Sequence, residues 1–449
     1  MDVAILIGTC LALFVAMLFF PWLAMAMLLS VPIVKAAAEY YVPIFQTVDL
    51  TLLTCAIAGA MGLWNLIRRP GQGAPFSFPW KPFFYLLILG VVLLVGVAWT
   101  TAPYYGTRKA LRFLGIGIPF LVLPSFLVRS KKDGRGMFYM TIGVGLLSAI
   151  GVLVLPETFL SQATYGRGYF RGTFLGSSPI MAGVMSAVGI LCLLCGFIVR
   201  GGMPGVIRFG SLLMLPVSLA AILKTGTRSS LAGLLITLLF LPILAGRRTR
   251  VASLFLVMLG IPIAVAAGYV YVESQTSRTA ERWSRVTEGA GAESLVSGRA
   301  EHYRFCLQNW YKKPILGHGC GSFAMDGAGR DEQAYPHNIV LEAMYEAGSV
   351  GTIALLAFIW VIARTGFKGL RLAQTPQDRL LILAPFFLTL MFLIQGMIHW
   401  DLDGVRFLYL FAGLLYANVQ QVAYTSELLP NHVERSASSW PRRRSAWAT

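Results

Sequence analysis

Residues 297–351 are the longest non-membrane stretch of an otherwise apolar chain, and they contain three of its five histidines. His337 precedes an amphipathic stretch that includes Glu342 and Glu346. Because the free pKa of histidine is about 6.5, its side chain can accept a proton at neutral pH. The alternative is a structural histidine that caps the following helix or bonds to Asn338. The histidines of this stretch are His302, His318 and His337.

A second set of residues is suited to binding an anion. The loop of residues 224–230, KTGTRSS, begins with Lys224 and is too short to reach far from a membrane. Gly226 allows the backbone to turn, and the serines can cap the next helix. A helix N-terminus beside Arg228 is a site for an anion such as a diphosphate. The alternative is an arginine that reaches the membrane surface from a simple hairpin.

The segment Arg167-Gly-Tyr-Phe-Arg171 precedes a further apolar stretch. Two arginines with aromatic neighbours can bind phosphate or stack on sugars. A belt of aromatic and basic residues at the membrane interface is the alternative.

The composition shows what must position these residues. The chain has 449 residues, of which 56% are hydrophobic and 13% charged, and its mean hydropathy is +0.68. Soluble proteins carry about 25% charged residues, and a membrane helix needs about 20 apolar ones. We therefore predict an all-α, polytopic membrane protein whose first apolar block is retained rather than cleaved. The expected spans are residues 3–34, 47–67, 82–100, 111–128, 137–155, 178–199, 211–223, 229–245, 251–271, 349–364, 379–398 and 405–422.

Two of these blocks are unusual. Residues 3–34 contain Pro21 and Pro32 and could form one kinked span or a tight pair. Residues 211–223 are short for a span, which suggests a helix that ends inside a cavity.

Basic residues predict the orientation. Clusters of Lys and Arg occur in every second loop and in the tail, and such clusters indicate the cytoplasmic side of a membrane protein. If residues 3–34 count as one of about twelve spans, those loops and both termini lie in the cytoplasm. We expect one transmembrane domain over residues 1–435, with a periplasmic catalytic region at 272–348, and a basic tail at 436–449. The clusters are Arg68/Arg69, Arg129/Lys131/Lys132/Arg135, Arg200/Arg208, Arg247/Arg248/Arg250, Arg364/Lys368/Arg371/Arg379 and Arg442/Arg443/Arg444.

The loops on the other side should be poor in cations, yet they are not. The net charge of the chain is +17, and the excess indicates an anionic partner on that side. Attraction to lipid headgroups is a sufficient explanation for Lys109 and Lys312, whereas arginine beside glycine at span ends fits a phosphate-bearing substrate. The cations concerned are Arg108, Lys109, Arg112, Arg167, Arg171, Lys224, Arg228, Arg278, Arg282, Arg285, Arg299, Arg304, Lys312, Lys313 and Arg330.

Helix signals predict how His337 is supported. Ser297 can cap a helix that Pro314 ends, and a glycine-rich loop, residues 317–321, follows. A second helix begins after His337, and Gly348 interrupts it before the chain re-enters the membrane. Cys306 and Cys320 would face an oxidising compartment, where a disulfide between them is possible.

Metal and nucleotide chemistry have little support. Asp401-Leu402-Asp403 could hold a divalent cation against a nucleotide diphosphate, but nucleotide sugars are absent outside the cytoplasm, so we expect ion pairs with the arginines instead. Cys192-x-x-Cys195 lies in an apolar stretch without a second pair, so we expect core residues. No Walker A, dinucleotide-binding, H-E-x-x-H or G-x-S-x-G motif occurs, which argues against ATP-driven transport and serine hydrolysis.

The order of several motifs resembles the O-antigen ligase and polymerase superfamily over roughly residues 220–400. The motifs are Arg299, Trp310, Pro314/Gly317/Gly319, His337-Asn338 and Glu346/Gly348/Gly351, together with the Thr-Gly-Thr-Arg loop that ends at Arg228.

This resemblance implies a glycosyltransferase of GT-C-like architecture in the bacterial inner membrane, with its active site on the periplasmic side. It implies transfer of a glycan from undecaprenyl diphosphate to the lipid A core, without metal or cofactor. His337 would be the base, and Arg228 and Arg299 the other catalytic residues. We expect a monomer that contacts membrane lipids and no nucleic acid. The expected substrate-binding residues are Arg167, Arg171, Lys224, Asn338 and Arg304.

Three alternatives remain open. An O-antigen polymerase would use two diphosphate-linked substrates, and a protein O-glycosyltransferase would use a protein acceptor. A transporter or flippase would carry charged residues in the middle of its spans, whereas nearly all charges of this chain lie at span ends. His399, beside Trp400 at a span end, is a weaker candidate than His337 for a functional histidine.

Overall fold

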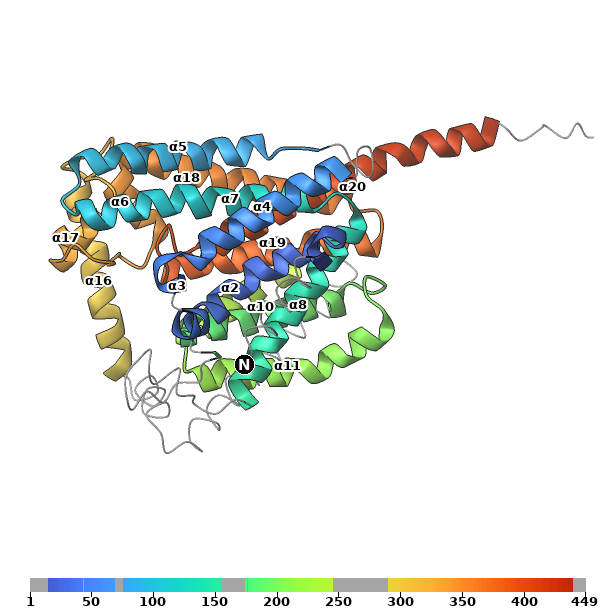
Figure 1. Cartoon of the computed structure of the whole chain (residues 1–449), viewed down its shortest axis with the longest axis horizontal. Coiled ribbons are helices and arrows are strands. Elements are labelled where there is room, and N and C mark those ends of the chain that lie inside the picture. Colours follow the sequence, from blue (N-terminus) through green and yellow to red (C-terminus); the bar gives the residue numbers. More distant parts are fainter. Residues whose placement is uncertain are drawn as a thin grey trace, which may run out of the picture.

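The computed structural model describes residues 15–42, 44–68, 76–154, 174–175, 177–244 and 290–438. Every regular element in these residues is helical, which confirms the all-α polytopic fold (Figure 1). Nine of the described helices are long and apolar enough to cross a membrane. The α-helices are α2 (Trp22–Tyr41), α3 (Ile44–Thr47), α4 (Leu50–Arg68), α5 (Trp80–Gly96), α6 (Pro103–Arg112), α7 (Ile118–Leu127), α8 (Lys131–Val154), α10 (Pro179–Ile198), α11 (Gly205–Thr225), α12 (Arg228–Leu239), α13 (Leu241–Leu244), α16 (Ala290–Trp310), α17 (Ser322–Ala328), α18 (Ile339–Leu372), α19 (Pro376–Ile398) and α20 (Arg406–Ser438).

The N-terminal block is divided at its first proline. Residues 15–19 are helical, the helix stops at Phe20, and α2 begins at Trp22. Pro32 lies inside α2 without ending it. Proline lacks an N–H group and clashes with the preceding turn, so a break at Pro21 is the ordinary outcome. The described part of this block therefore favours two helical segments over one continuous span. The expected span at 251–271 lies outside the described residues.

The expectation that residues 211–223 form a short helix ending in a cavity is wrong. Helix α11 has 21 residues and is long enough to cross a membrane, because it continues past Arg208 at one end and to Thr225 at the other. The next apolar helix, Arg228–Ile243, is the shorter one. At 1.5 Å per residue, the 12 residues of α12 cover about 18 Å of a hydrocarbon core that is about 30 Å thick.

Helix α16 also differs from expectation at its start. It begins at Ala290, so Ser297 lies within the helix and is not its N-cap. The other end agrees, because the helix finishes at Trp310, before Pro314. Ser297 matched the capping pattern by type, but a serine is also tolerated inside a helix.

Glycine interrupts the longest helix where the sequence predicted it. Helix α18 runs along α5 (Figure 1), and Gly348 within it has φ 63° and ψ −161°. The glycine-rich loop packs into this break: the His318 N–H donates to the Tyr345 carbonyl at 2.8 Å, and the Gly319 N–H to the Glu346 carbonyl at 3.0 Å. The two glycine motifs thus fit against each other and fix the angle between the halves of α18.

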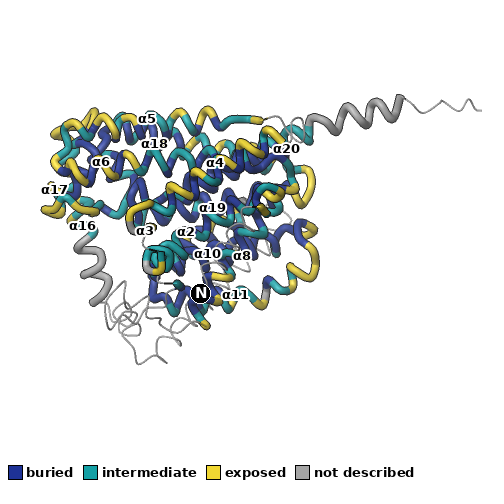
Figure 2. The backbone as a smooth tube through the Cα atoms, in the orientation of Figure 1, coloured by how far each residue is buried: buried dark blue, intermediate teal, exposed yellow. Residues whose placement is uncertain are grey.

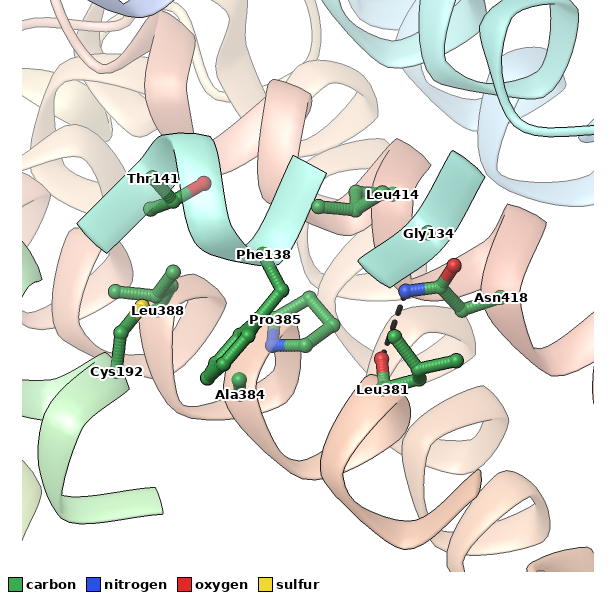
Figure 3. Close-up of a pocket in the computed structure, with 10 residues that line it drawn as sticks. All are labelled: Gly134, Phe138, Thr141, Cys192, Leu381, Ala384, Pro385, Leu388, Leu414 and Asn418. Atoms are coloured by element: carbon green, nitrogen blue, oxygen red, sulfur yellow. Dashed lines mark hydrogen bonds between the residues drawn. The ribbon is translucent and has the colours of Figure 1, made fainter. Parts of the chain in front are cut away.

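The helices pack tightly around their shared interior, which Figure 2 shows as a continuous buried region. Between α8, α10, α19 and α20 lies a cavity of about 10 Å³, close to the volume of one water probe (Figure 3). The Asn418 amide crosses one end of it and donates to the Leu381 carbonyl at 2.7 Å. Cys192 lines the cavity, and Cys195 is buried nearby, so both are core residues as predicted.

Candidate active site

His337 sits in a constrained turn directly before α18. Its backbone has φ 60°, a left-handed conformation that is uncommon for residues other than glycine. Its Nδ1 lies 3.0 Å from the carbonyl oxygen of His399, at the end of α19. A carbonyl only accepts hydrogen bonds, so Nδ1 carries the proton in this contact and Nε2 keeps its lone pair. Nε2 is therefore the nitrogen that can take a proton from a substrate.

Two further histidines flank His337. The rings of His337 and His399 are stacked with centroids 5.6 Å apart, and those of His337 and His302 with centroids 6.4 Å apart. The Tyr335 ring packs edge-on against the His337 ring, with ring centroids 4.6 Å apart. Nδ1 of His302 is buried and has no hydrogen-bond partner among the described residues. The structure thus builds a histidine cluster from α16, the turn before α18 and the end of α19.

The surroundings favour the neutral form of His337. Burial lowers the pKa of His337 below its ordinary value of 6.5, and the positive charges of Arg299 and His302 lower it further. The His399 carbonyl and the Asp401 carboxylate raise the pKa of His337, but their effect is smaller and the pKa stays below its ordinary value. An imidazole that is neutral at neutral pH is the form that can act as a base.

Asn338 has a structural role in this arrangement. Its side-chain oxygen accepts hydrogen bonds from the N–H groups of Val340 at 3.0 Å and Leu341 at 3.1 Å, so it caps α18. Its amide nitrogen lies 3.4 Å from the Met397 carbonyl on α19. The His-Asn pair therefore joins α18 to the end of α19 and holds His337 in place.

The two arginines of α16 lie in different environments. Arg299 is half-buried, and its positive charge adds to the effect of burial in lowering the pKa of His337. Arg304 is exposed, and its position five residues later is rotated by roughly 140° around the helix. Arg299 thus belongs to the histidine cluster, whereas Arg304 presents its charge on a different side of α16.

The loop of residues 224–230 reaches the same end of the molecule through α19. Gly226 adopts the left-handed conformation at φ 62°, and α12 begins at Arg228, which is half-buried. The Ser229 carbonyl accepts a hydrogen bond from the Gln395 amide at 2.9 Å. The Gln395 backbone carbonyl in turn accepts from the N–H of His399 at 2.7 Å. One turn of α19 therefore links the start of α12 to the histidine cluster.

The remaining predicted cations are less central. Lys224 donates to the Leu153 carbonyl at the end of α8, at 3.2 Å. Arg167 and Arg171 lie outside the described residues.

Lys109 is buried, and the interpretation that it attracts lipid headgroups is wrong. It is 2% exposed and forms ion pairs with both Glu342 and Glu346 of α18, the second at 2.6 Å. The carboxylates also accept backbone hydrogen bonds, Glu342 from Leu402 at 2.9 Å and Glu346 from Gly321 at 2.8 Å. We call these three side chains the Lys109 cluster; it ties α6, the glycine-rich loop and the α19–α20 loop to the first half of α18.

The two aspartates between α19 and α20 form protein contacts. Asp403 pairs with Arg112 at 3.3 Å, as expected for ion pairing with the arginines. Asp401 accepts from the Gly404 N–H at 2.7 Å and from the Tyr105 hydroxyl at 3.3 Å. Among the described residues, no group of three or more His, Cys, Asp or Glu side chains could hold a metal ion. Cys306 and Cys320 are both buried free thiols, so the possible disulfide is not formed.

Sequence reasoning identified His337 and Arg299 but missed two members of the cluster. His302 and His399 were weaker candidates than His337 because neither lies in a recognisable motif. His302 does lie one helical turn after Arg299, so a shared face of α16 was a usable signal. His399 had no such signal, because its place beside His337 depends on how α18 and α19 meet.

Part of the chain is similar to a known protein family. Residues 209–356, about a third of the chain, match the model of the family described as O-antigen ligase. This region contains Arg228, Arg299 and His337. No curated protein matches the chain. The fold is that of a polytopic membrane protein, with nine helices among the described residues that are long and apolar enough to span a membrane. Within that fold, residues 209–356 are similar to the O-antigen ligase family.

Proposed function

We propose that this protein is an O-antigen ligase. It transfers O-antigen from undecaprenyl diphosphate to a sugar hydroxyl of the lipid A core, on the periplasmic face of the bacterial inner membrane. The observation that carries the proposal is the contact of His337 Nδ1 with the His399 carbonyl. That contact leaves Nε2 as a neutral base beside Arg299, inside the region that matches the family.

The proposed step balances without a metal. The acceptor hydroxyl oxygen attacks the anomeric carbon, and its proton passes to His337 Nε2. The bond from that carbon to the diphosphate oxygen breaks, and its electron pair leaves with the diphosphate. Attack opposite the leaving group inverts the anomeric centre. Arg228 and Arg299 are suited to the growing negative charge, because a guanidinium is permanently charged and can donate two parallel hydrogen bonds to phosphate.

The ligase is favoured over its alternatives by charge. The expected periplasmic loops carry an excess of arginine and lysine, which suits an acceptor that itself bears phosphates. A polymerase is the second candidate and a protein O-glycosyltransferase the third. The Lys109 cluster is the type of buried charge that a transporter would use. It lies near the ends of its helices, however, and each carboxylate pairs with Lys109 and accepts a hydrogen bond from a backbone N–H group.

A deletion strain distinguishes these functions. Loss of the ligase should remove O-antigen from lipopolysaccharide while lipid-linked polymer accumulates. Loss of a polymerase should instead leave single repeat units attached to the core. Purified protein with lipid-linked donor and lipid A core should carry out transfer in the presence of EDTA. Lipid-linked polymer that fails to accumulate, or transfer that needs added Mg²⁺ or Mn²⁺, would contradict the proposed reaction.

Arg228→Ala should weaken donor binding and slow transfer. The loss of a hydrogen bond to a charged group costs about 2 kcal/mol, which corresponds to roughly 30-fold weaker binding of the lipid diphosphate. Arg228→Lys should recover only part of this, because lysine keeps the charge but lacks the planar fork. Donor affinity and initial rate are the measurements. Arg208→Ala, which removes a cation near the opposite end of α11, is the matched control and should bind donor normally.

The pH profile should report the lowered pKa of His337. Since the folded protein favours the neutral imidazole, kcat/KM should stay high as the pH falls to 6.5 and decline only below it. Arg299→Gln removes a nearby positive charge, so the acidic limb should move to higher pH even though the maximal rate also falls. An acidic limb that stays in place in Arg299→Gln would show that another group titrates.

The orientation has a direct test. A reporter fused after Ser297 should give a periplasmic signal, and one fused after Ser436 a cytoplasmic signal. A cytoplasmic signal from the first fusion would place the histidine cluster on the cytoplasmic side, and the proposed periplasmic reaction would fail.

A further inference from the structure

A large pocket lies at the end of the helix bundle opposite the histidine cluster. Its volume is about 800 Å³, and its walls come from α5, α18 and α20. Arg364 of α18 lines it, 25 residues after Ile339 where that helix begins, or roughly 35 Å along a helix. Helix α5 runs antiparallel to α18, because Trp99 beyond its C-terminal end contacts the Gly317 carbonyl near the break at Gly348. The pocket is therefore separate from the candidate active site.

The pocket combines cations with apolar surface. Lys81, Arg364 and Lys368 line it, and no Asp or Glu occurs among its lining residues. Trp80 and Trp360 also line it, and both are more than 65% exposed. Pockets that bind small molecules typically have a volume of about 300–1,000 Å³, mostly apolar walls and a few polar groups. In a membrane-spanning helix bundle, exposed tryptophans mark the zone between lipid tails and headgroups.

We propose that this pocket binds an anionic phospholipid. Lys81, Arg364 and Lys368 bind the phosphate and headgroup, and the aromatic walls contact the start of the acyl chains. Basic pockets between membrane helices hold anionic headgroups in this way. The occupant must be anionic and amphipathic, which the pocket's charge and walls both require. The Arg-rich tail of this chain does not fit, because it would bring Arg442, Arg443 and Arg444 toward three further cations.

Ordinary attraction of cations to a membrane surface would not need a pocket. A surface lysine attracts any anionic lipid from one side, whereas in this protein residues of three helices line one open pocket. Two polar residues of the lining, Thr365 and Gln420, add hydrogen-bond partners for a headgroup. Tyr416 of α20 fixes the wall by donating to the Phe78 carbonyl at 3.4 Å, directly before α5.

The test uses the full-length protein in phosphatidylcholine vesicles that contain a small fraction of brominated lipid. Brominated phosphatidylglycerol should quench Trp80 and Trp360 more than brominated phosphatidylcholine does. Trp80→Phe/Trp360→Phe should remove this excess and so show that the signal arises in the pocket. Each basic side chain near an anionic lipid contributes on the order of fivefold in binding. Arg364→Gln/Lys368→Gln should therefore lower the relative association of phosphatidylglycerol about 25-fold.

A matched control removes the same charge outside the pocket. Lys132 and Arg371 are exposed cations at the same end of the bundle as the pocket. Lys131, the neighbour of Lys132, pairs with Asp378 at the start of α19, and Arg371 lies shortly before that start in the sequence. Lys132→Gln/Arg371→Gln should keep the excess quenching. Lys81→Gln, on a different helix, should lower the association about fivefold, so the result does not depend on one helix remaining intact. Equal quenching by the two brominated lipids, or equal losses in the pocket and control variants, would overturn the proposal.

Discussion

His337→Ala should slow glycan transfer by about 10²–10⁴-fold, the range that a general base contributes. The His337 Nε2 atom has the lone pair, because Nδ1 faces the His399 carbonyl. Burial and Arg299 keep the ring neutral at neutral pH, so the wild-type protein has its base ready before substrate binds. Alanine removes that base and leaves Arg228 and Arg299, the proposed ligands of the diphosphate, in place. Donor affinity and the thermal-melt midpoint should therefore change little.

His318→Ala is the matched control for this prediction. The His318 ring stacks on Tyr345 with centroids 4.4 Å apart, and its Nε2 lies 3.0 Å from the Asn309 carbonyl. It is thus a packed histidine of the same segment outside the cluster, and its loss should leave transfer within about a factor of ten. If His337→Ala keeps more than about a tenth of the wild-type rate, the base is another residue or water, and leaving-group stabilisation by the arginines carries catalysis.

Lys109→Met should destabilise the protein strongly, and more than the loss of any of the half-buried arginines. It leaves the Glu342 and Glu346 carboxylates buried side by side without their cation. Removing one partner of a buried ion pair costs about 3–5 kcal/mol, because the remaining charge is uncompensated. We expect a marked fall in the thermal-melt midpoint of the purified protein. Transfer should fall with it, since the cluster holds the half of α18 that follows His337.

Two comparisons separate charge from packing in the Lys109 cluster. Lys109→Met/Glu342→Gln/Glu346→Gln removes all three charges and should recover much of the lost stability, because neutral replacement of a buried ionic group is often tolerated. Lys131→Met breaks the Lys131–Asp378 pair, in which Lys131 is 31% exposed, and should cost about 1 kcal/mol or less. A Lys109→Met thermal-melt midpoint that matches that of Lys131→Met would mean that the buried cluster contributes no more to stability than a pair whose lysine is partly exposed.

Part of the helix arrangement followed from local signals. The break of α18 at Gly348 and the end of α16 before Pro314 were predicted because glycine and proline act on the backbone at their own positions. Helix starts were less accurate. Ser297 is inside α16, and α11 is longer than its apolar block, because tertiary contacts let a helix continue beyond the residues that favour it.

The sequence by itself determined the membrane class and the resemblance to the O-antigen ligase superfamily, and it singled out His337 as the candidate base. Span composition follows from the cost of exposing polar groups to lipid, which acts on each segment separately, and the ordered motifs around His337 lie within one continuous region. Only the tertiary structure decided which side chains meet. His302, His337 and His399 come from three parts of the chain, and their stacking depends on how α16, α18 and α19 pack. The role of Lys109 was mispredicted for the same reason. Lys109 lies at a span end, and its partners Glu342 and Glu346 follow 233 and 237 residues later. Helix packing decides whether such a cation faces lipid or carboxylates, and sequence spacing does not encode that packing.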